Sequence, residues 1–215
     1  MQMLLRSDPR PPAAASAQLR EAVHAAGLGL QAVGFTCLQE WIPAARVAEL
    51  CAEALRLRDG AQTVSRDNGE GYRARLAGLG AAGRAFLSGD DMTALMGALF
   101  DVPLAPDMRA SCYTYYGPGD FLGAHVDHPE QCLVTAIAYL HVIRPKRAGT
   151  RTGLELHILE GDPAIERRAP RAVLPTSAGA LVLGLGSVHW HARPPLQDGE
   201  HLAAMTACYS RLASA

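Results

Sequence analysis

From Arg109 onward, the chain consists of short segments that are rich in β-branched or aromatic residues and bounded by Gly, Pro or Asp. They lie at 109–116, 132–143, 153–160, 171–175, 180–185, 187–193 and 202–210. Short strands at such spacing predict a sandwich or barrel rather than alternating β-α-β units. We therefore expect the second half of the chain to form a mostly antiparallel double sheet.

The first half has a helical pattern. Residues 16–27 begin at a potential Ser16 cap and end at Gly27, and residues 43–58 begin at Pro43 and carry an apolar stripe. A third helix is predicted over 91–100, and the polar, glycine-rich stretch 59–72 is predicted to be a loop. We expect one domain over 1–215: a flexible lead at 1–15, a mainly helical part at 16–108 and a β core at 109–211.

Charge and composition exclude some classes of function. The chain has 20 Lys and Arg against 21 Asp and Glu, so it lacks the basic excess of a nucleic-acid or membrane-surface protein. The apolar run Met3 to Leu5 is too short for a signal peptide or a spanning helix. The number of cysteines is odd and no CxxC pair occurs, which favours reduced cysteines in the cytoplasm, most of them small core residues.

Two pairs of candidate metal ligands occur in the second half. His125 and Asp127 are two residues apart, so in an extended segment both side chains point to one face. His189 and His191 repeat this spacing. One of the latter two with His125 and Asp127 would give two imidazoles and one carboxylate, a facial triad suited to non-haem Fe(II) oxygen chemistry. The spacing alone does not choose between His189 and His191.

Several further motifs follow in a fixed order around these residues. They are Tyr116-Gly117-Pro118-Gly119, His125-Val126-Asp127, Ala138-Tyr139-Leu140, Gly153-Leu154-Glu155-Leu156, Pro175 with Gly179-Ala180-Leu181-Val182-Leu183, and His191-Ala192-Arg193-Pro194-Pro195-Leu196 with Gly199. In this order they resemble the iron(II)- and 2-oxoglutarate-dependent dioxygenases, most nearly the branch that contains the prolyl 4-hydroxylases. The resemblance covers about residues 109–211. It implies a double-stranded β-helix (jelly-roll) core that holds Fe(II) at its mouth and is buttressed by the N-terminal helices, an α+β, mainly β protein.

The resemblance also implies which histidine is the distal ligand. The family has a Pro four residues and a Gly eight residues after it, and counting from His191 reaches Pro195 and Gly199. The implied metal ligands, which are also the catalytic residues, are therefore His125, Asp127 and His191, with His189 a neighbour on the same face. His128 is expected in a solvated loop, and His141 and His157 in the sheet.

The sequence departs from the family at the residue that binds the far carboxylate of 2-oxoglutarate. The family has Lys or Arg there, whereas this chain has His201. His201 can still donate a hydrogen bond, another cation such as Arg193, Arg211 or Arg144 can replace it, or the co-substrate can differ. Tyr116 matches a family tyrosine that often binds this carboxylate, and a core aromatic is an equal alternative.

The expected function is that of an Fe(II)- and 2-oxoglutarate-dependent dioxygenase that uses O₂ on a small-molecule or amino-acid-like substrate. Asp127 favours hydroxylation or desaturation over halogenation, because halogenating relatives have a small residue there. Basic residues in two loops are candidates to hold an acidic group, although solvated loop charges are the commoner case: Arg66, Arg73, Arg75, Arg144, Lys146, Arg147 and Arg151. The alternatives are an iron oxygenase of the same fold without 2-oxoglutarate and a non-catalytic metal-binding jelly-roll module.

Overall fold

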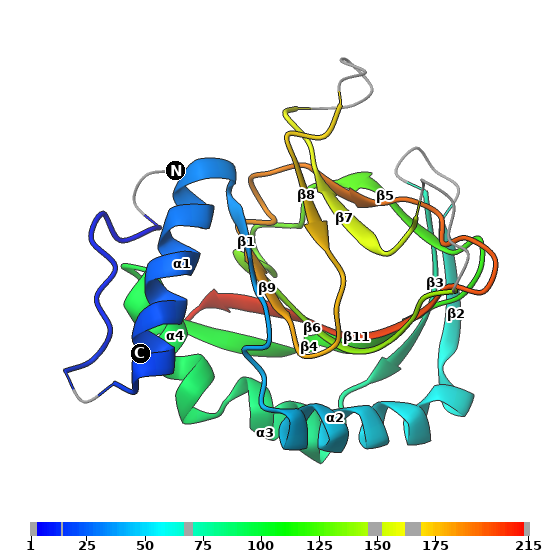
Figure 1. Cartoon of the computed structure of the whole chain (residues 1–215), viewed down its shortest axis with the longest axis horizontal. Coiled ribbons are helices and arrows are strands. Elements are labelled where there is room, and N and C mark those ends of the chain that lie inside the picture. Colours follow the sequence, from blue (N-terminus) through cyan, green and yellow to red (C-terminus); the bar gives the residue numbers. More distant parts are fainter. Residues whose placement is uncertain (1–3, 14, 67–70, 146–151, 162–168, 213–215) are drawn as a thin grey trace.

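The structure is a computed structural model that describes residues 4–13, 15–66, 71–145, 152–161 and 169–212. Its strands pair antiparallel in the order β1-β9-β6-β11-β4-β3-β5-β10-β7-β8, and β2 is added beside β3. At the two ends of this order, Cys37 Sγ of β1 lies 3.8 Å from the carbonyl oxygen of Pro175 in β8. The predicted double sheet is therefore one continuous antiparallel sheet that curls into a nearly closed barrel (Figure 1).

The longest strands lie in the wall beside the helices, and the opposite wall is built from shorter ones. Their bounds are β1 Phe35–Leu38, β2 Gln62–Arg66, β3 Tyr72–Gly78, β4 Leu104–Tyr116, β5 Phe121–His125, β6 Val134–Ile143, β7 Glu155–Ile158, β8 Ala172–Pro175, β9 Leu181–Gly184, β10 His191–Arg193 and β11 His201–Arg211. β4, β11 and β6 are neighbours in the wall beside the helices, and β5, β10 and β7 are neighbours in the opposite wall (Figure 1). All the strands predicted from the sequence are present, with shifted ends.

The helices come from the first half of the chain and lie outside the barrel. They are α1 Ala17–Val33, α2 Ala44–Leu57, the 3₁₀ helix η1 Arg58–Gly60, α3 Ala81–Leu87 and α4 Asp90–Leu99. Figure 1 shows α1 beside β1 and β9, whereas α2 and α3 lie along the β4, β11 and β6 wall. This confirms the predicted jelly-roll core with buttressing helices.

Two sequence predictions of local structure are wrong. The first helix does not stop at Gly27 but continues to Val33 and ends at Gly34, which has a positive φ of 79°. Gly27 faces Pro9, and a Cβ there would lie 2.8 Å from the proline Cγ, so the glycine serves close packing. The stretch 59–72, predicted to be a loop, contains strand β2. Its residues Gln62 to Arg66 pair antiparallel with β3.

Alternating side chains of the wall strands divide the apolar core in two. Ala203, Met205 and Ala207 of β11 pack with the helices, whereas Leu202 and Ala204 pack inside the barrel with Tyr139. A strand residue and its next-but-one neighbour share a face, so each wall strand contributes to both clusters. Several residues of the inner cluster line the interior of the barrel.

The five cysteines differ in state. The structure joins Cys132 and Cys208 in a disulfide, so the expectation of reduced cysteines is wrong for this pair, while Cys37, Cys51 and Cys112 are free thiols. The register of β11 against β6 brings Cys132 and Cys208 together. The spacing of the cysteines in the sequence does not predict this pairing. Among the described residues, no helix is long and apolar enough to cross a membrane. A cytoplasmic location stays a prediction.

Candidate metal centre

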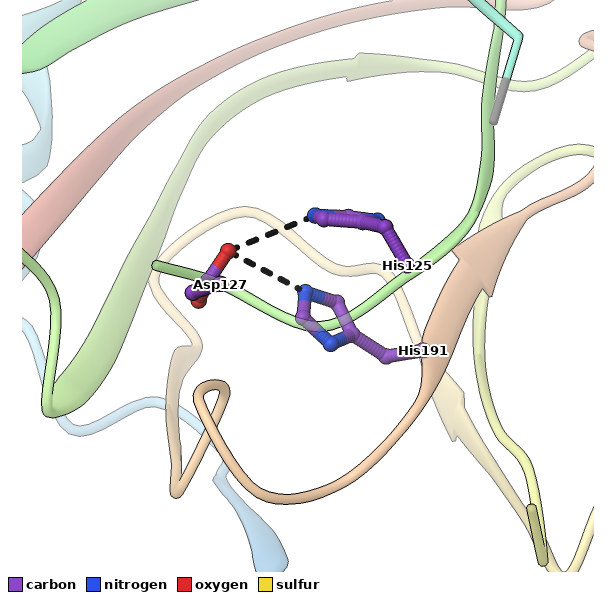
Figure 2. A group of neighbouring side chains, drawn as sticks. All are labelled: His125, Asp127 and His191. Carbon is purple, nitrogen blue, oxygen red and sulfur yellow. Dashed lines mark ion pairs between the residues drawn. The ribbon is translucent and has the colours of Figure 1, made fainter. Parts of the chain in front are cut away.

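The side chains of His125, Asp127 and His191 converge, as Figure 2 shows. His125 is the last residue of β5, and His191, the first residue of β10, lies directly opposite it in the antiparallel pair. Their ring centroids are 4.2 Å apart. Asp127 follows β5 by two residues, so the local spacing supplies two side chains and strand pairing supplies the third.

The donor atoms of these three residues face one another. Asp127 Oδ1 lies 3.3 Å from His125 Nε2 and 3.9 Å from His191 Nε2. Each Nδ1 lies 3.0 Å from a backbone carbonyl oxygen, that of Gly123 for His125 and that of His189 for His191. A carbonyl oxygen only accepts, so each Nδ1 carries the ring proton and the Nε2 lone pairs are directed to the shared centre. Two imidazoles and one carboxylate can therefore hold one metal ion.

The Asp127 carboxylate is held in place by its surroundings. Its backbone N–H donates to the carbonyl oxygen of Gly186 at 2.9 Å, and its Oδ2 accepts a hydrogen bond from Thr135 Oγ1. A Cβ at Gly186 would lie 2.0 Å from Oδ2, so only glycine fits there. Burial raises the pKa of this carboxyl group, but its contacts with His125, His191 and Thr135 lower it overall. Asp127 is thus kept as the carboxylate, the form that binds metals.

His191 is the most enclosed of the three. Its residue exposure is 2 %, and the Phe35 ring lies 5.2 Å from its ring. Burial, together with His125, lowers its pKa to about 4. At neutral pH the imidazole is therefore uncharged, as metal coordination requires.

The His189 side chain does not join this cluster and lines a different pocket. The residues before β10 form a turn rather than a strand, so the same-face rule for residues two apart does not apply. A Cβ on Gly34 would lie 2.0 Å from the His189 ring, which lines a separate pocket with Arg171. The expectation that His189 is a neighbour on the ligand face is therefore wrong. His128 is exposed, and His141 and His157 lie in β6 and β7.

A cavity of about 310 Å³ opens beside the three residues. Arg193, two residues after His191, lines it and is only 3 % exposed. Its guanidinium donates to the Gly153 carbonyl oxygen at 3.0 Å, to Thr176 Oγ1 at 3.1 Å and to the Tyr139 hydroxyl at 2.8 Å. In the part of the chain that the structure describes, no carboxylate forms an ion pair with it. A buried cation with only neutral acceptors favours an anionic ligand.

The other predicted co-substrate residues lie in three different places. Tyr116 lines the cavity, and its ring lies 5.6 Å from the Arg193 guanidinium carbon. His201 lies on the outer face of the wall, where it lines a different pocket, and Arg211 is exposed at the end of β11. His201 has the strand parity of Ala203, which packs toward the helices, and not that of Leu202.

The basic loop residues do not line the cavity where the structure describes them. Arg73 forms an ion pair with Asp120 at 2.9 Å, and Arg75 donates to the carbonyl oxygen of Arg58 at 2.8 Å. Arg144 is exposed. Lys146, Arg147 and Arg151 and the side chain of Arg66 lie outside the described residues.

Sequence reasoning missed Thr135 and the role of Tyr139. Both line the cavity, where one donates to Asp127 and the other accepts from Arg193. The sequence pattern that could have identified them lies in strand β6. There Thr135, Ile137 and Tyr139 alternate with small or aliphatic residues that face the helices. The alternation identifies the set, but only strand pairing shows that it faces the histidines.

The architecture of the chain is similar to that of several solved structures. No protein-family model and no curated protein matches the chain. Among solved structures, a prolyl-4-hydroxylase from Pseudomonas putida is 20 % identical with a TM-score of 0.63, and the match covers 87 % of this chain and 98 % of that one. An oxidoreductase of the 2OG-Fe(II) oxygenase family from Burkholderia pseudomallei is 17 % identical with a TM-score of 0.64, covering 96 % and 95 %.

A third similar structure is the non-haem alpha ketoglutarate dependent epimerase SnoN from nogalamycin biosynthesis. It is 17 % identical with a TM-score of 0.69, and the match covers 89 % of this chain and 82 % of that one. The likeness extends over most of each chain although the identities are low. The protein therefore has the fold of these oxygenases, the double-stranded β-helix.

Proposed function

We propose that the protein is a non-haem Fe(II)- and 2-oxoglutarate-dependent oxygenase that hydroxylates a small molecule. The observation that carries the proposal is the convergence of His125, Asp127 and His191 beside a cavity lined by the buried cation Arg193, with which no carboxylate of the described residues pairs. The first group fits a metal, and the second fits an anionic co-substrate of that metal.

His125, Asp127 and His191 would hold the iron. Two imidazoles and one carboxylate on one side of an ion leave the remaining positions open, as in non-haem Fe(II) oxygenases. When bound, Fe(II) supplies the site at which O₂ and the organic reactants are brought together and activated. The chain's own contribution is to fix the donor atoms through the Gly123 and His189 carbonyl groups and the Thr135 hydroxyl.

Arg193 would bind the far carboxylate of 2-oxoglutarate. It follows His191 by two residues on β10, so both side chains face the cavity. An arginine guanidinium can pair with a carboxylate through two parallel hydrogen bonds, and the hydrogen bond to the Tyr139 hydroxyl helps to fix the orientation of Arg193. The similar epimerase SnoN has been solved in complex with Fe³⁺ and alpha ketoglutarate, which supports this co-substrate. Arg193 thus takes the role for which the sequence also offered His201 and Arg211.

The substrate is a small, largely apolar molecule under this proposal. Beyond the ligand residues and Arg193, the cavity is lined mainly by apolar side chains, among them Val64, Leu76, Leu122 and Leu156. No second cation lines it within the described ranges. Burying a charged substrate group there without a partner would be costly, so an uncharged hydrocarbon portion is the best fit next to the metal. Hydroxylation rather than halogenation remains the proposed outcome, because Asp127 keeps a carboxylate at the metal.

A second candidate is an iron oxygenase of this fold that does not use 2-oxoglutarate. The observation that favours it is the outward position of His201, which leaves the family's usual anchor position without a cation inside the cavity. Under this reading Arg193 would bind the carboxylate of the substrate itself.

Iron and co-substrate titrations of protein purified without O₂ test these assignments. We expect one Fe(II) per chain, and O₂-dependent conversion of 2-oxoglutarate to succinate that is slow without substrate. His125→Ala should lose stoichiometric iron. His189→Ala is the matched control and should retain it, because only the backbone carbonyl of residue 189 contacts His191.

Each alternative predicts a different result in the same experiment. Iron binding without any binding or consumption of 2-oxoglutarate would favour the second candidate. No iron binding in the wild-type protein would contradict both and leave a non-catalytic jelly-roll module.

A further inference from the structure

The outer face of the barrel wall carries a row of aligned residues across four neighbouring strands. Arg75 of β3 is opposite Tyr115 of β4, which is opposite Ala203 of β11, which is opposite His141 of β6. Residues in register on neighbouring strands have their side chains within contact distance. The row thus has Arg75 at one end and His141 at the other, with Tyr115 and Ala203 between them.

This row ends in a hollow because the helical layer stops there. Helix α2 ends at Leu57, and η1 brings Arg58 over the edge of the sheet. Beside Tyr115, Gly117 has no side chain, and a Cβ there would lie 3.8 Å from His201 Nδ1. The result is a pocket of about 290 Å³, here called the outer pocket, lined by Arg58, Arg75, His141 and His201 with Tyr115, Gly117 and Asp120.

The outer pocket has more nitrogen donors than carboxylates. Its one described carboxylate, Asp120, is already used: it accepts from the Gly117 N–H at 2.9 Å and from Arg73 Nε at 2.9 Å. Arg75 gives one nitrogen to the Arg58 carbonyl oxygen, and no described carboxylate pairs with Arg58, His141 or His201. Burial raises the pKa of Tyr115 to about 12, and the nearby charges of Arg58 and Arg75 act against that rise. Both guanidinium groups therefore lie close to this face of the sheet.

We propose that the outer pocket binds a small oxyanion, the phosphate or carboxylate group of a metabolite. Two guanidinium groups and two imidazoles around one pocket are the donors that recognise such a group. The sheet separates the pocket from the metal cavity, and Tyr116 and Leu202 contribute to both linings. The inference does not depend on the proposed function.

Calorimetric titration of the metal-free protein at low ionic strength with inorganic phosphate, and separately with succinate, tests the proposal. We expect saturable binding of one of the two. In NMR spectra, the imidazole proton signals of His141 and His201, assigned with the variants His141→Gln and His201→Gln, should shift when the anion binds. Arg58→Ala should weaken binding by about tenfold or more, because it removes a charge-assisted hydrogen bond. Arg58→Lys should keep part of the affinity.

Arg109→Ala is the matched control, because Arg109 is an exposed arginine of β4 outside the pocket and its loss changes the net charge equally. It should change the affinity less than about twofold. The anion that binds more tightly identifies the source as a phosphorylated or a carboxylated molecule. Failure of both anions to bind, unchanged His141 and His201 signals, or equal losses in the Arg58 and Arg109 variants would overturn the proposal.

Discussion

The two faces of the barrel wall differ in chemistry although the same strands form them. On β11, Leu202, Ala204 and Thr206 line the metal cavity, whereas His201 and Ala203 line the outer pocket. Among the described residues, the inner face holds a single buried cation, Arg193, in an apolar surrounding, whereas the outer face has two arginines and two imidazoles around a hollow. In a strand, a shift of one residue moves a side chain to the opposite face, so neighbours in sequence serve different sites.

The largest expected effect is on 2-oxoglutarate affinity, and it distinguishes a residue of the inner face, Arg193, from one of the outer face, His201. Arg193→Gln should weaken 2-oxoglutarate binding by at least about 30-fold, because a buried carboxylate would lose its charged partner. His201→Ala should change it less than about twofold, since His201 lies outside the cavity. Calorimetry of the Fe(II)-loaded variants without O₂ measures both affinities.

Arg193→Lys and iron titration control for misfolding in that comparison. The lysine variant keeps the charge and should recover part of the affinity, while both Arg193 variants still bind one iron. A strong loss in His201→Ala with normal binding in Arg193→Gln would reverse the assignment of the two faces.

A smaller effect is expected from two threonines on the inner face. Thr135 donates to Asp127, whereas Thr114 pairs with Thr206 at 3.2 Å. Thr135→Val should lower the Fe(II) affinity about tenfold, because the carboxylate loses the group that orients it. Thr114→Val is its control, an identical change in the same cavity, and should leave iron binding unchanged. Equal iron affinities for the two variants would show that the Thr135 contact does not support the metal.

The smallest effect concerns two buried carboxylates, Glu53 of α2 and Glu200 just before β11. Glu53 accepts from the N–H groups of Ala82 and Gly83 and from the Tyr113 hydroxyl. Glu200 accepts from the Thr152 hydroxyl and from the N–H groups of Gly153 and Gln197. Burial raises both pKa values, but these hydrogen bonds lower them overall below the ordinary 4.5. A lowered folded-state pKa contributes stability above pH 4.5 that is lost as the pH falls through the folded-state value.

Glu53→Gln and Glu200→Gln should therefore each flatten the loss of unfolding free energy at acid pH, measured by denaturant titration. Only Glu200→Gln should also weaken 2-oxoglutarate binding, by a few-fold, because Glu200 holds Gly153, whose carbonyl oxygen accepts from Arg193. If both variants weaken the co-substrate equally, the effect is one of general stability and not of Arg193 placement.

Sequence patterns alone predicted much of this molecule. The apolar stripe and Pro43 gave helix 43–58, close to the observed α2, and the spacing of short β-branched segments gave the antiparallel core. These are local signals, because the period of a helix or strand is fixed by the backbone and is readable in any short window. The two-residue spacing of His125 and Asp127 is another local signal, whereas the choice of His191 over His189 came from the resemblance to the dioxygenase family. Together they named the three residues that the structure brings together.

Only the tertiary structure decided which face each of these residues occupies. Parity shows that Leu202 and His201 point in opposite directions, but the pairing of β11 with β4 and β6 decides that Leu202 faces the histidines and His201 faces outward. The placement of Arg193 against Gly153, Thr176 and Tyr139 likewise joins segments 17 to 54 residues apart. Such long-range register results from burying the whole apolar face at once, a property of all the strands together that no single segment encodes.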